Sequence, residues 1–269
     1  MHSSLLEYFK QYLYTGGMPE AVVSFFRNPV SGESASERVR TIQKNLIINY
    51  QADIAKHCGK TNAMHIERLW SHIPMQLAST QDSHAAKFKF KDVIPNIRGF
   101  DRLAGPMDWL IKARLVLKTP IINRAEQPLM AYTKENIFKL FMFDVGILNA
   151  FTSLERSLIQ SFDFGTYKGY LAENFVAQEL HALGIPLLSW QEGTAQIEFI
   201  TSDQGRVVPI EVKSGRNTRA KSLLSFKKKY APPLAIKLSL LPFTSRVEEA
   251  TLNVPIYAAH MLPQIMQNY

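Results

Sequence analysis

Cysteine is nearly absent from the 269-residue sequence, which contains only Cys58. A single cysteine excludes a disulfide framework within the chain and a zinc site built from cysteines, and it fits a reducing compartment. The first residues lack a basic segment followed by an apolar core, so no signal peptide is expected. No uncharged apolar run approaches the length of a membrane span. We therefore expect a soluble cytoplasmic protein without membrane contact.

The composition is otherwise that of an ordinary globular protein, with 46% hydrophobic and 20% charged residues. The length allows one large domain or two of ordinary size. The net charge of +8 and the isoelectric point near 9.5 favour anionic partners such as nucleic acid.

The first part of the chain, residues 1–155, reads as a helical region. Periodic apolar residues predict helices over 4–26, with a break at Thr15–Pro19, and over 37–57, 62–79 and 98–112. The alternating lysines and phenylalanines of Lys87–Val93 predict a strand with one wet face. Short strands are expected at 115–117 and 120–122, and a strand followed by a helix over 138–148. Helices that lead into a hairpin over residues 60–125 favour a winged-helix-like unit.

The second part, residues 156–269, has a different pattern. An amphipathic helix is expected at Tyr167–Leu183, followed by strands at Pro186–Trp190, Gln196–Thr201 and Val207–Lys213. A helix at 219–230 and a strand at 234–238 come next. This order predicts an α/β sandwich with a mixed sheet, against which residues 241–269 pack.

The segment Ile210-Glu211-Val212-Lys213 carries two charges in an otherwise apolar strand. Because side chains alternate along a strand, Glu211 and Lys213 share one face while Ile210 and Val212 occupy the other. A strand that is buried on one face rarely carries two such charges without a partner or a task. This pair is therefore the centre of the expected site.

Two further carboxylates are expected to join this pair. Gly205 favours a hairpin that would place Glu198 beside Glu211, and Glu173 lies on the preceding helix. Two carboxylates held that close repel unless a cation bridges them, and Mg²⁺ prefers hard oxygen ligands. The sequence thus predicts Glu198, Glu211 and Glu173 as magnesium ligands, with Lys213 stabilising charge on a phosphodiester under attack by water.

A plainer interpretation stays open for each of these residues. A Glu-x-Lys pair on a strand is most often an exposed salt bridge, and Glu173 alone is most often a solvated helix residue. The hypothesis of a site depends on the occurrence of all four residues, in order, within a suitable pattern of helices and strands.

Basic residues follow the expected site and could track a nucleic-acid backbone. The candidates for nucleic-acid binding are Arg216, Arg219, Lys221, Lys227 and Lys228. A plain solvated helix explains them equally well. For Lys87, Lys89 and Lys91, a solvated strand face is the better explanation than phosphate binding.

Several segments together resemble a known family. The C-terminal domain found after many bacterial and archaeal AAA-type ATPases, a domain of unknown function with a PD-(D/E)xK nuclease-like fold, is similar to this chain over nearly its whole length. The segments that carry the resemblance are Gly16–Glu20, Trp70–Pro74, Phe138–Gly146, Glu173–Leu180, Ile210–Gly215 and Lys221–Leu223.

The resemblance implies a helical, partly winged-helix-like region followed by a nuclease-like fold. It also implies Asp where this chain has Glu198, and the extra methylene extends the carboxylate by about 1.5 Å. We find no ATPase domain within these 269 residues. Gly59-Lys60-Thr61 is no phosphate-binding loop, because glycine is absent at position 54, and we expect Gly59 to end one helix and Thr61 to cap the next.

Two functions from different classes remain. The first is Mg²⁺-dependent hydrolysis of DNA by a nuclease-like module. The alternative is a non-catalytic DNA- or protein-binding module that serves a separate AAA-type ATPase. The oligomeric state stays open.

Overall fold

Helices form most of the first part of the protein. The computed structural model describes residues 1–27, 34–78, 87–97, 99–162, 164–215, 220–246 and 250–269. The helices of this part are α1 (His2–Thr15), α2 (Pro19–Phe26), α3 (Ala35–His57), α4 (Lys60–Ala78) and α5 (Phe100–Lys112). They confirm the helices that the apolar spacing predicted.

The ends of these helices follow from local chemistry. Pro19 opens α2, and Ser34 caps α3 by accepting a hydrogen bond from the backbone N–H of Glu37, whose side chain reaches back to Ser34. Gly59, with φ of +71°, follows the end of α3 as expected. The expected cap at Thr61 is wrong, because α4 already begins at Lys60.

The strand predicted over Lys87–Val93 does not form. Residues 87–90 have no regular structure and 91–93 form a turn. Phe88 donates a backbone hydrogen bond to Phe138 (2.8 Å) and is buried, while Lys87, Lys89 and Lys91 are exposed. The predicted alternation of exposed lysines with buried or partly buried phenylalanines is therefore confirmed. The segment packs through its phenylalanine side chains and does not form the backbone ladder of a strand.

One mixed sheet is shared between the two parts of the chain. Its strands are β1 (Val116–Ile122), β2 (Phe138–Met142), β3 (Ser189–Glu192) and β4 (Ala195–Ile197), in the order β2-β1-β3-β4. The two short strands expected at 115–122 are one strand, β1, which pairs antiparallel with β2 and parallel with β3. The expectation that the strands after residue 186 all belong to one sheet is therefore wrong.

A second mixed sheet is built wholly from the last part of the chain. It contains β5 (Phe199–Asp203), β6 (Arg206–Lys213), β7 (Ala235–Ser239), β8 (Thr244–Arg246) and β9 (Thr251–Pro255), in the order β5-β6-β7-β9-β8. Strands β6, β7 and β9 are parallel, and the two outer pairs are antiparallel. This mixed sheet agrees with the predicted α/β class.

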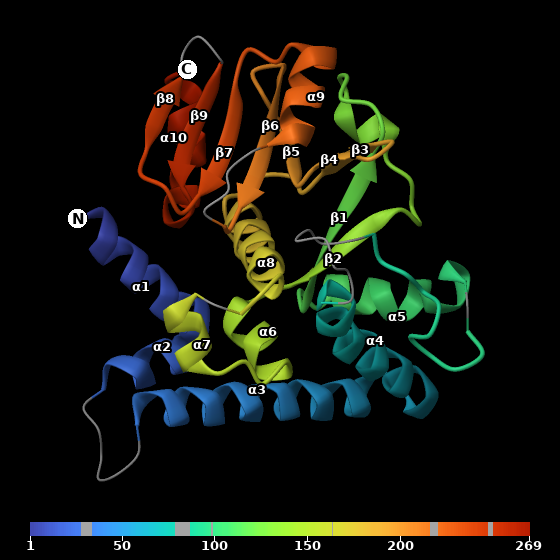
Figure 1. The fold of residues 1–269 in the computed structure, drawn as a ribbon. Coiled ribbons are helices and arrows are strands. Elements are labelled where there is room, and N and C mark those ends of the chain that lie inside the picture. Colours follow the sequence, from blue (N-terminus) through green and yellow to red (C-terminus); the bar gives the residue numbers. More distant parts are fainter. Residues whose placement is uncertain (28–33, 79–86, 98, 163, 216–219, 247–249) are drawn as a thin grey trace.

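Helix α8 (Tyr167–Ala182) lies at the centre of the molecule, between the strands and the helices α3 and α6 (Val145–Phe151) (Figure 1). It was expected to be amphipathic, but every residue from Gly169 to Ala177 is buried. The reason is that α8 contacts both sheets and α6 at once, so no side of its middle faces water. Helix α9 (Lys221–Tyr230) packs against β4, and its Leu223 and Phe226 form a second small core with Trp190.

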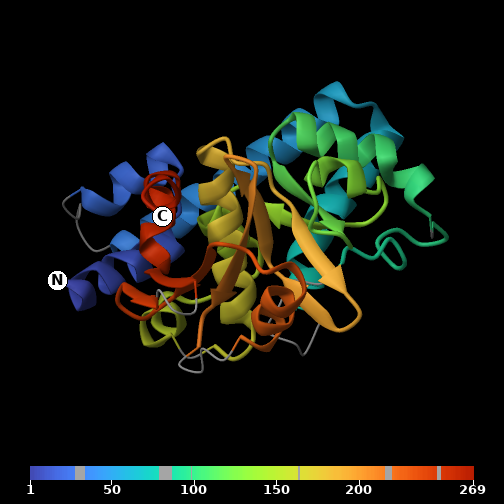
Figure 2. The ribbon, with the colours of Figure 1, turned by 90° about the horizontal axis from the view of Figure 1, so that it is seen from above.

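The remaining short elements complete the body. They are α7 (Arg156–Ser161), the 3-10 helices at Leu129–Tyr132 and Ile256–Met261, and α10 (Leu262–Gln267). The C-terminal residues, red in Figure 2, lie beside the blue N-terminal helices. His2 contacts the hydroxyl of Tyr257 at 2.9 Å, so the two ends of the described chain are joined.

Two motifs far apart in sequence meet at the start of α6. Asp144 caps α6 by accepting from the N–H of Ile147 (2.9 Å), and it accepts a second bond from Gly17 (2.7 Å). Burial raises the pKa of Asp144, against the opposing effect of these backbone donors. Gly146 is needed here, since a Cβ would lie 2.6 Å from the carbonyl oxygen of Thr15.

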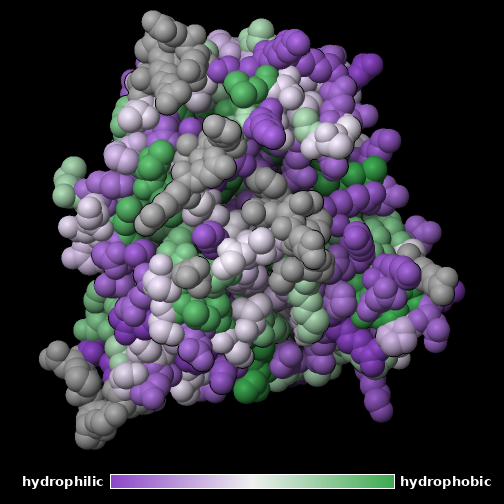
Figure 3. All heavy atoms as spheres, viewed as in Figure 1, coloured by the Kyte–Doolittle hydropathy of each residue, from purple (hydrophilic) through white to green (hydrophobic). Residues whose placement is uncertain are grey.

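No helix of the described segments is long and apolar enough to cross a membrane. The face in Figure 3 mixes hydrophilic and hydrophobic residues, with hydrophilic ones frequent along its right side, over the α4 and α5 part.

Candidate functional site

A tight hairpin brings the first two carboxylates together. Strands β5 and β6 are joined by Gln204 and Gly205, both with positive φ (47° and 79°), the conformation of a two-residue hairpin turn. Phe199 pairs with Ile210, so the same register carried back by one residue sets Glu198 opposite Glu211. The predicted hairpin is confirmed.

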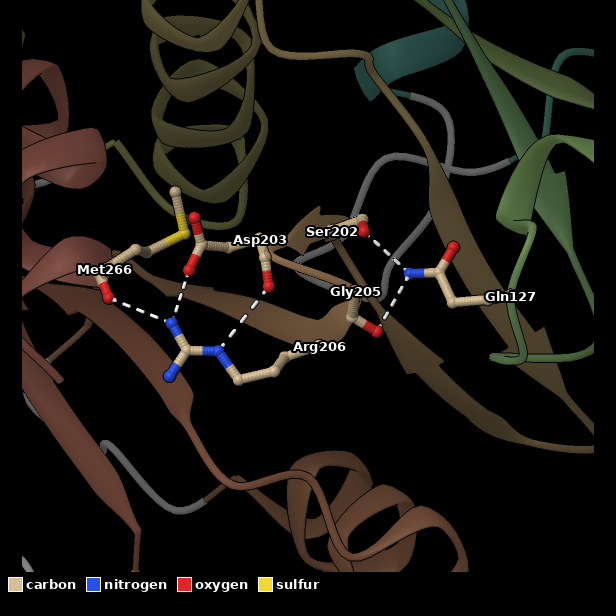
Figure 4. Close-up of polar contacts among 6 residues, drawn as sticks. All are labelled: Gln127, Ser202, Asp203, Gly205, Arg206 and Met266. Atoms are coloured by element: carbon tan, nitrogen blue, oxygen red, sulfur yellow. Dashed lines mark hydrogen bonds and ion pairs between the residues drawn. The ribbon is translucent and has the colours of Figure 1, made fainter.

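The turn of this hairpin is held from both sides (Figure 4). Gln127, from the loop after β1, donates to the hydroxyl of Ser202 (2.6 Å) and to the carbonyl of Gly205 (3.5 Å). Arg206 forms an ion pair with Asp203 and donates to the carbonyl of Met266 in α10 (3.3 Å). These contacts fix the register that sets Glu198 against Glu211.

Glu211 and Lys213 form an ion pair at the end of β6. The Nζ of Lys213 lies 2.6 Å from Oε1 of Glu211, and the side chains are 14% and 2% exposed. Glu198 is fully buried, and its Oε2 accepts from the N–H of Val212 at 3.0 Å. The pair is therefore not the ordinary exposed salt bridge that was the plainer interpretation.

Three carboxylates act on the ammonium of Lys213. Burial by itself lowers the pKa of Lys213, but the charges of Glu198, Glu211 and Glu173 and the hydrogen bond that Lys213 donates to Glu211 together raise the pKa above its ordinary value. The structure thus brings all four predicted residues into one electrostatic cluster.

Glu173 enters the cluster from α8 and is 1% exposed, so its interpretation as a solvated helix residue is wrong. Its Oε2 lies 3.3 Å from Nζ of Lys139 in β2, which is equally buried. A charge at such depth is costly unless it is paired. Lys139 therefore compensates Glu173 and belongs to the site.

Sequence reasoning missed Lys139. The signal was present, since Lys139 is the one charge in the run Ile137-Phe138-Lys139-Leu140-Phe141-Met142. The argument that singled out Glu211 and Lys213, a charge within an apolar strand, applies equally to this position.

Two amides on α8 fix the helix against β2 and α6. Asn174 accepts a hydrogen bond from the N–H of Met142 (2.8 Å) and donates one to its carbonyl (2.9 Å). Both backbone polar groups of Met142, at the end of β2, therefore have a partner. Gln178 accepts from the N–H of Val145 at 3.1 Å. These bonds hold the backbone of α8, and with it Glu173, at a fixed distance from Lys139.

The donor set suits a hard cation, but the arrangement does not form a finished metal site. Within the described parts of the chain, no group of three or more His, Cys, Asp or Glu side chains could hold a metal ion as it stands. One carboxylate oxygen of Glu211 is paired with the ammonium of Lys213, and one oxygen of Glu198 accepts a hydrogen bond from the N–H of Val212. Magnesium binding by Glu173, Glu198 and Glu211 stays a prediction.

Three of the five basic residues expected to bind nucleic acid, Lys221, Lys227 and Lys228, lie on α9. Arg216 and Arg219 lie outside the described residues. Lys227 donates to the hydroxyl of Thr251 (2.8 Å), whereas Lys221 and Lys228 are exposed at opposite ends of α9. Nucleic-acid binding by this set stays a prediction.

Comparison with known proteins divides the chain into two matched regions. Residues 6–158 match the family model described as "Domain of unknown function (DUF8612)", and residues 168–257 match "Domain of unknown function (DUF4143)". The first match covers more than half of the chain, so the protein belongs to the DUF8612 family.

Lys139 lies in the first matched region, and Glu173, Glu198, Glu211 and Lys213 lie in the second. No curated protein is significantly similar to the chain. Among solved structures, the chain is similar to one titled "Crystal structure of protein VC1899 from Vibrio cholerae", with 10% identity and a TM-score of 0.25. That match covers 96% of this chain, which spans 60% of the other protein's length.

Proposed function

We propose that the region from residue 156 onward is a nuclease-like domain that hydrolyses phosphodiester bonds in DNA with the help of a divalent cation. The observation that carries this proposal is geometric: Glu211 lies 2.6 Å from Lys213 at the end of β6, Glu198 is hydrogen-bonded to the N–H of Val212 between them, and Glu173, Glu198 and Glu211 are all buried. Perturbed titratable groups gathered at one point are typical of functional sites. The nuclease-like and winged-helix-like descriptions of the fold belong to this proposal.

Each residue of the cluster has a distinct task. Lys213, the most exposed of the four, meets the phosphate and stabilises the negative charge that develops on it. Glu211 orients Lys213 through their 2.6 Å contact. The charges of Glu198 and Glu173 keep the ammonium of Lys213 protonated, and an ion pair with Lys139 fixes the position of Glu173. A divalent cation, when bound, supplies further charge stabilisation, and carboxylate oxygens are the ligands that Mg²⁺ prefers.

A second candidate function is a non-catalytic module that serves an AAA-type ATPase. Two observations favour it. The three carboxylates are 0–1% exposed, and two of them already contact lysines. The DUF4143 match also points to a C-terminal domain associated with AAA ATPases.

Incubation with supercoiled plasmid and Mg²⁺ or Mn²⁺ separates the two functions. The nuclease proposal predicts nicked or linear product from the parent protein and none from Lys213→Ala. Equal cleavage by both proteins would assign the activity to a contaminant and reject the catalytic proposal. A salt-dependent DNA mobility shift without cleavage would favour the non-catalytic module.

A further inference from the structure

A cavity of about 630 Å³ lies beside the residues that directly follow β6. Ser214 and Gly215, the two residues after Lys213, form part of its lining. The lining also includes Phe9 and Lys10 of α1, Phe162 after α7 and Lys168 of α8. The volume lies within the range of pockets that bind small ligands, which is about 300–1,000 Å³.

The cavity joins the two matched regions of the chain. Lys10 belongs to the DUF8612 region, whereas Lys168, Ser214 and Gly215 belong to the DUF4143 region. A ligand bound here would therefore touch both regions, next to the strand end that carries Glu211 and Lys213.

The charged side chains among the described residues of the lining are the two lysines. Lys10 is 22% exposed, and its ammonium lies 2.8 Å from Glu7, whose side chain is 61% exposed. A surface pair of this kind contributes little stability, so Lys10 can exchange Glu7 for an anionic ligand at small cost. The described lining of the cavity thus contains two lysines and no carboxylate, a charge that favours an anion.

Phe9 and Phe162 are the aromatic residues of the lining; Phe9 is buried and packs edge-on against Phe175, whereas Phe162 is only partly buried. Phe162 has φ of 54° and ψ of 29°, a left-handed conformation at the end of α7 where glycine is the usual residue. A bulky residue in this conformation costs about 1–2 kcal/mol. Such strain at the wall of a cavity is a reason to look for a function of the ring.

We propose that this cavity binds one unpaired nucleotide of a single-stranded polynucleotide. The lysines contact its phosphate, and the ring of Phe162 stacks on its base. A cationic groove combined with a stacking aromatic is how proteins bind single strands, and base-paired nucleotides would have to leave the duplex to enter a cavity of this size. The inference rests on the proposed function, because it names single-stranded nucleic acid as the substrate of that site.

Fluorescence anisotropy with a fluorescein-labelled oligothymidylate in EDTA tests the role of the ring. Phe162→Leu keeps an apolar side chain of similar size but removes the ring, and Phe162→Tyr keeps the ring. We expect Phe162→Leu to weaken binding about tenfold and Phe162→Tyr to restore it. Thermal melting of both variants checks that the fold is intact. Equal affinity of Phe162→Leu and the parent would reject the stacking role.

Charge reversals test the lysines. We expect Lys10→Glu and Lys168→Glu each to weaken binding and to reduce the slope of log affinity against log salt by about one. Lys56→Glu is the matched control, since it makes the same charge change at an exposed position in the last turn of α3, outside the cavity lining. A loss equal to that of Lys56→Glu would show only an effect of net charge and overturn the site.

A labelled duplex of the same length completes the test. Tighter binding to the duplex than to the single strand would overturn the inference, even if plasmid cleavage supports the nuclease proposal. Conversely, ring-dependent binding of the single strand in a protein that cleaves nothing would uphold the cavity and reject the nuclease.

Discussion

Two lysine–glutamate pairs belong to one buried cluster, and they differ in their access to solvent. Lys139 and Glu173 are 3.3 Å apart and each 1% exposed. Lys213 and Glu211 are 2.6 Å apart, and Lys213 is 14% exposed. The closed pair joins α8 to β2, whereas the open pair is the one that water can reach. Under the proposed function, the closed pair is structural and the open pair is the one that meets the substrate.

The largest expected effect concerns the chemistry of the open pair. Glu211→Gln keeps the shape of the side chain but removes the charge that orients Lys213, and we expect cleavage to fall about 100-fold. Single-turnover cleavage of labelled DNA measures the change, with unfolding in urea as a check on the fold. Loss of stability in parallel with activity would contradict a purely chemical role.

The next expected effect concerns the stability of the closed pair. Lys139→Met leaves Glu173 buried beside an apolar side chain, so we expect the free energy of unfolding to fall by about 3 kcal/mol. The matched change Lys213→Met also leaves buried carboxylates without their lysine, but it should cost less, because the side chain of Lys213 is 14% exposed and that of Lys139 only 1%. Urea denaturation of both variants measures the difference. Similar losses of stability in the two variants would contradict the distinction between the closed and the open pair.

A smaller effect is expected where α8 is fixed to β2. Asn174→Ala removes the partner of both backbone groups of Met142, and we expect a loss of about 2 kcal/mol. Gln178→Ala removes bonds to the N–H of Val145 and to the hydroxyl of Tyr12, but both lie in a partly buried place where water can replace them, so it should cost less than Asn174→Ala. Denaturation curves that show the reverse order would contradict the assignment of Asn174 as the main clamp.

The smallest effect is a pH dependence that belongs to the open pair. The pKa of Lys213 is raised above 10.5, so its charge contributes stability that is complete below that pH. This contribution is lost as the pH rises through the folded-state pKa. Lys213→Met should therefore have a flatter stability profile above about pH 10.5 than the parent. Identical profiles in urea titrations at alkaline pH would contradict the raised pKa.

The order of elements could be predicted from the sequence because apolar spacing and turn residues are local signals. Pro19 and Gly205 marked the start of a helix and the turn of a hairpin correctly. Glu211 and Lys213 were recognisable because their charges interrupt an apolar strand. These signals required no knowledge of distant contacts.

Long-range packing could not be predicted in the same way. The parallel pairing of β1 with β3 joins residues about 70 positions apart and leaves no local pattern. The burial of α8 on all sides depends on elements from both parts of the chain. The partnership of Lys139 with Glu173 depends on that burial, so it too became visible only in the folded structure.

The central claim is that the open end of the cluster performs phosphodiester hydrolysis. Single-turnover cleavage of labelled DNA by Lys213→Ala and Lys213→Arg, beside the parent, tests it most directly. The account predicts cleavage by the parent, a loss of at least about 100-fold in Lys213→Ala and partial recovery in Lys213→Arg. Absence of cleavage by the parent with either Mg²⁺ or Mn²⁺, or equal rates in all three proteins, would contradict it.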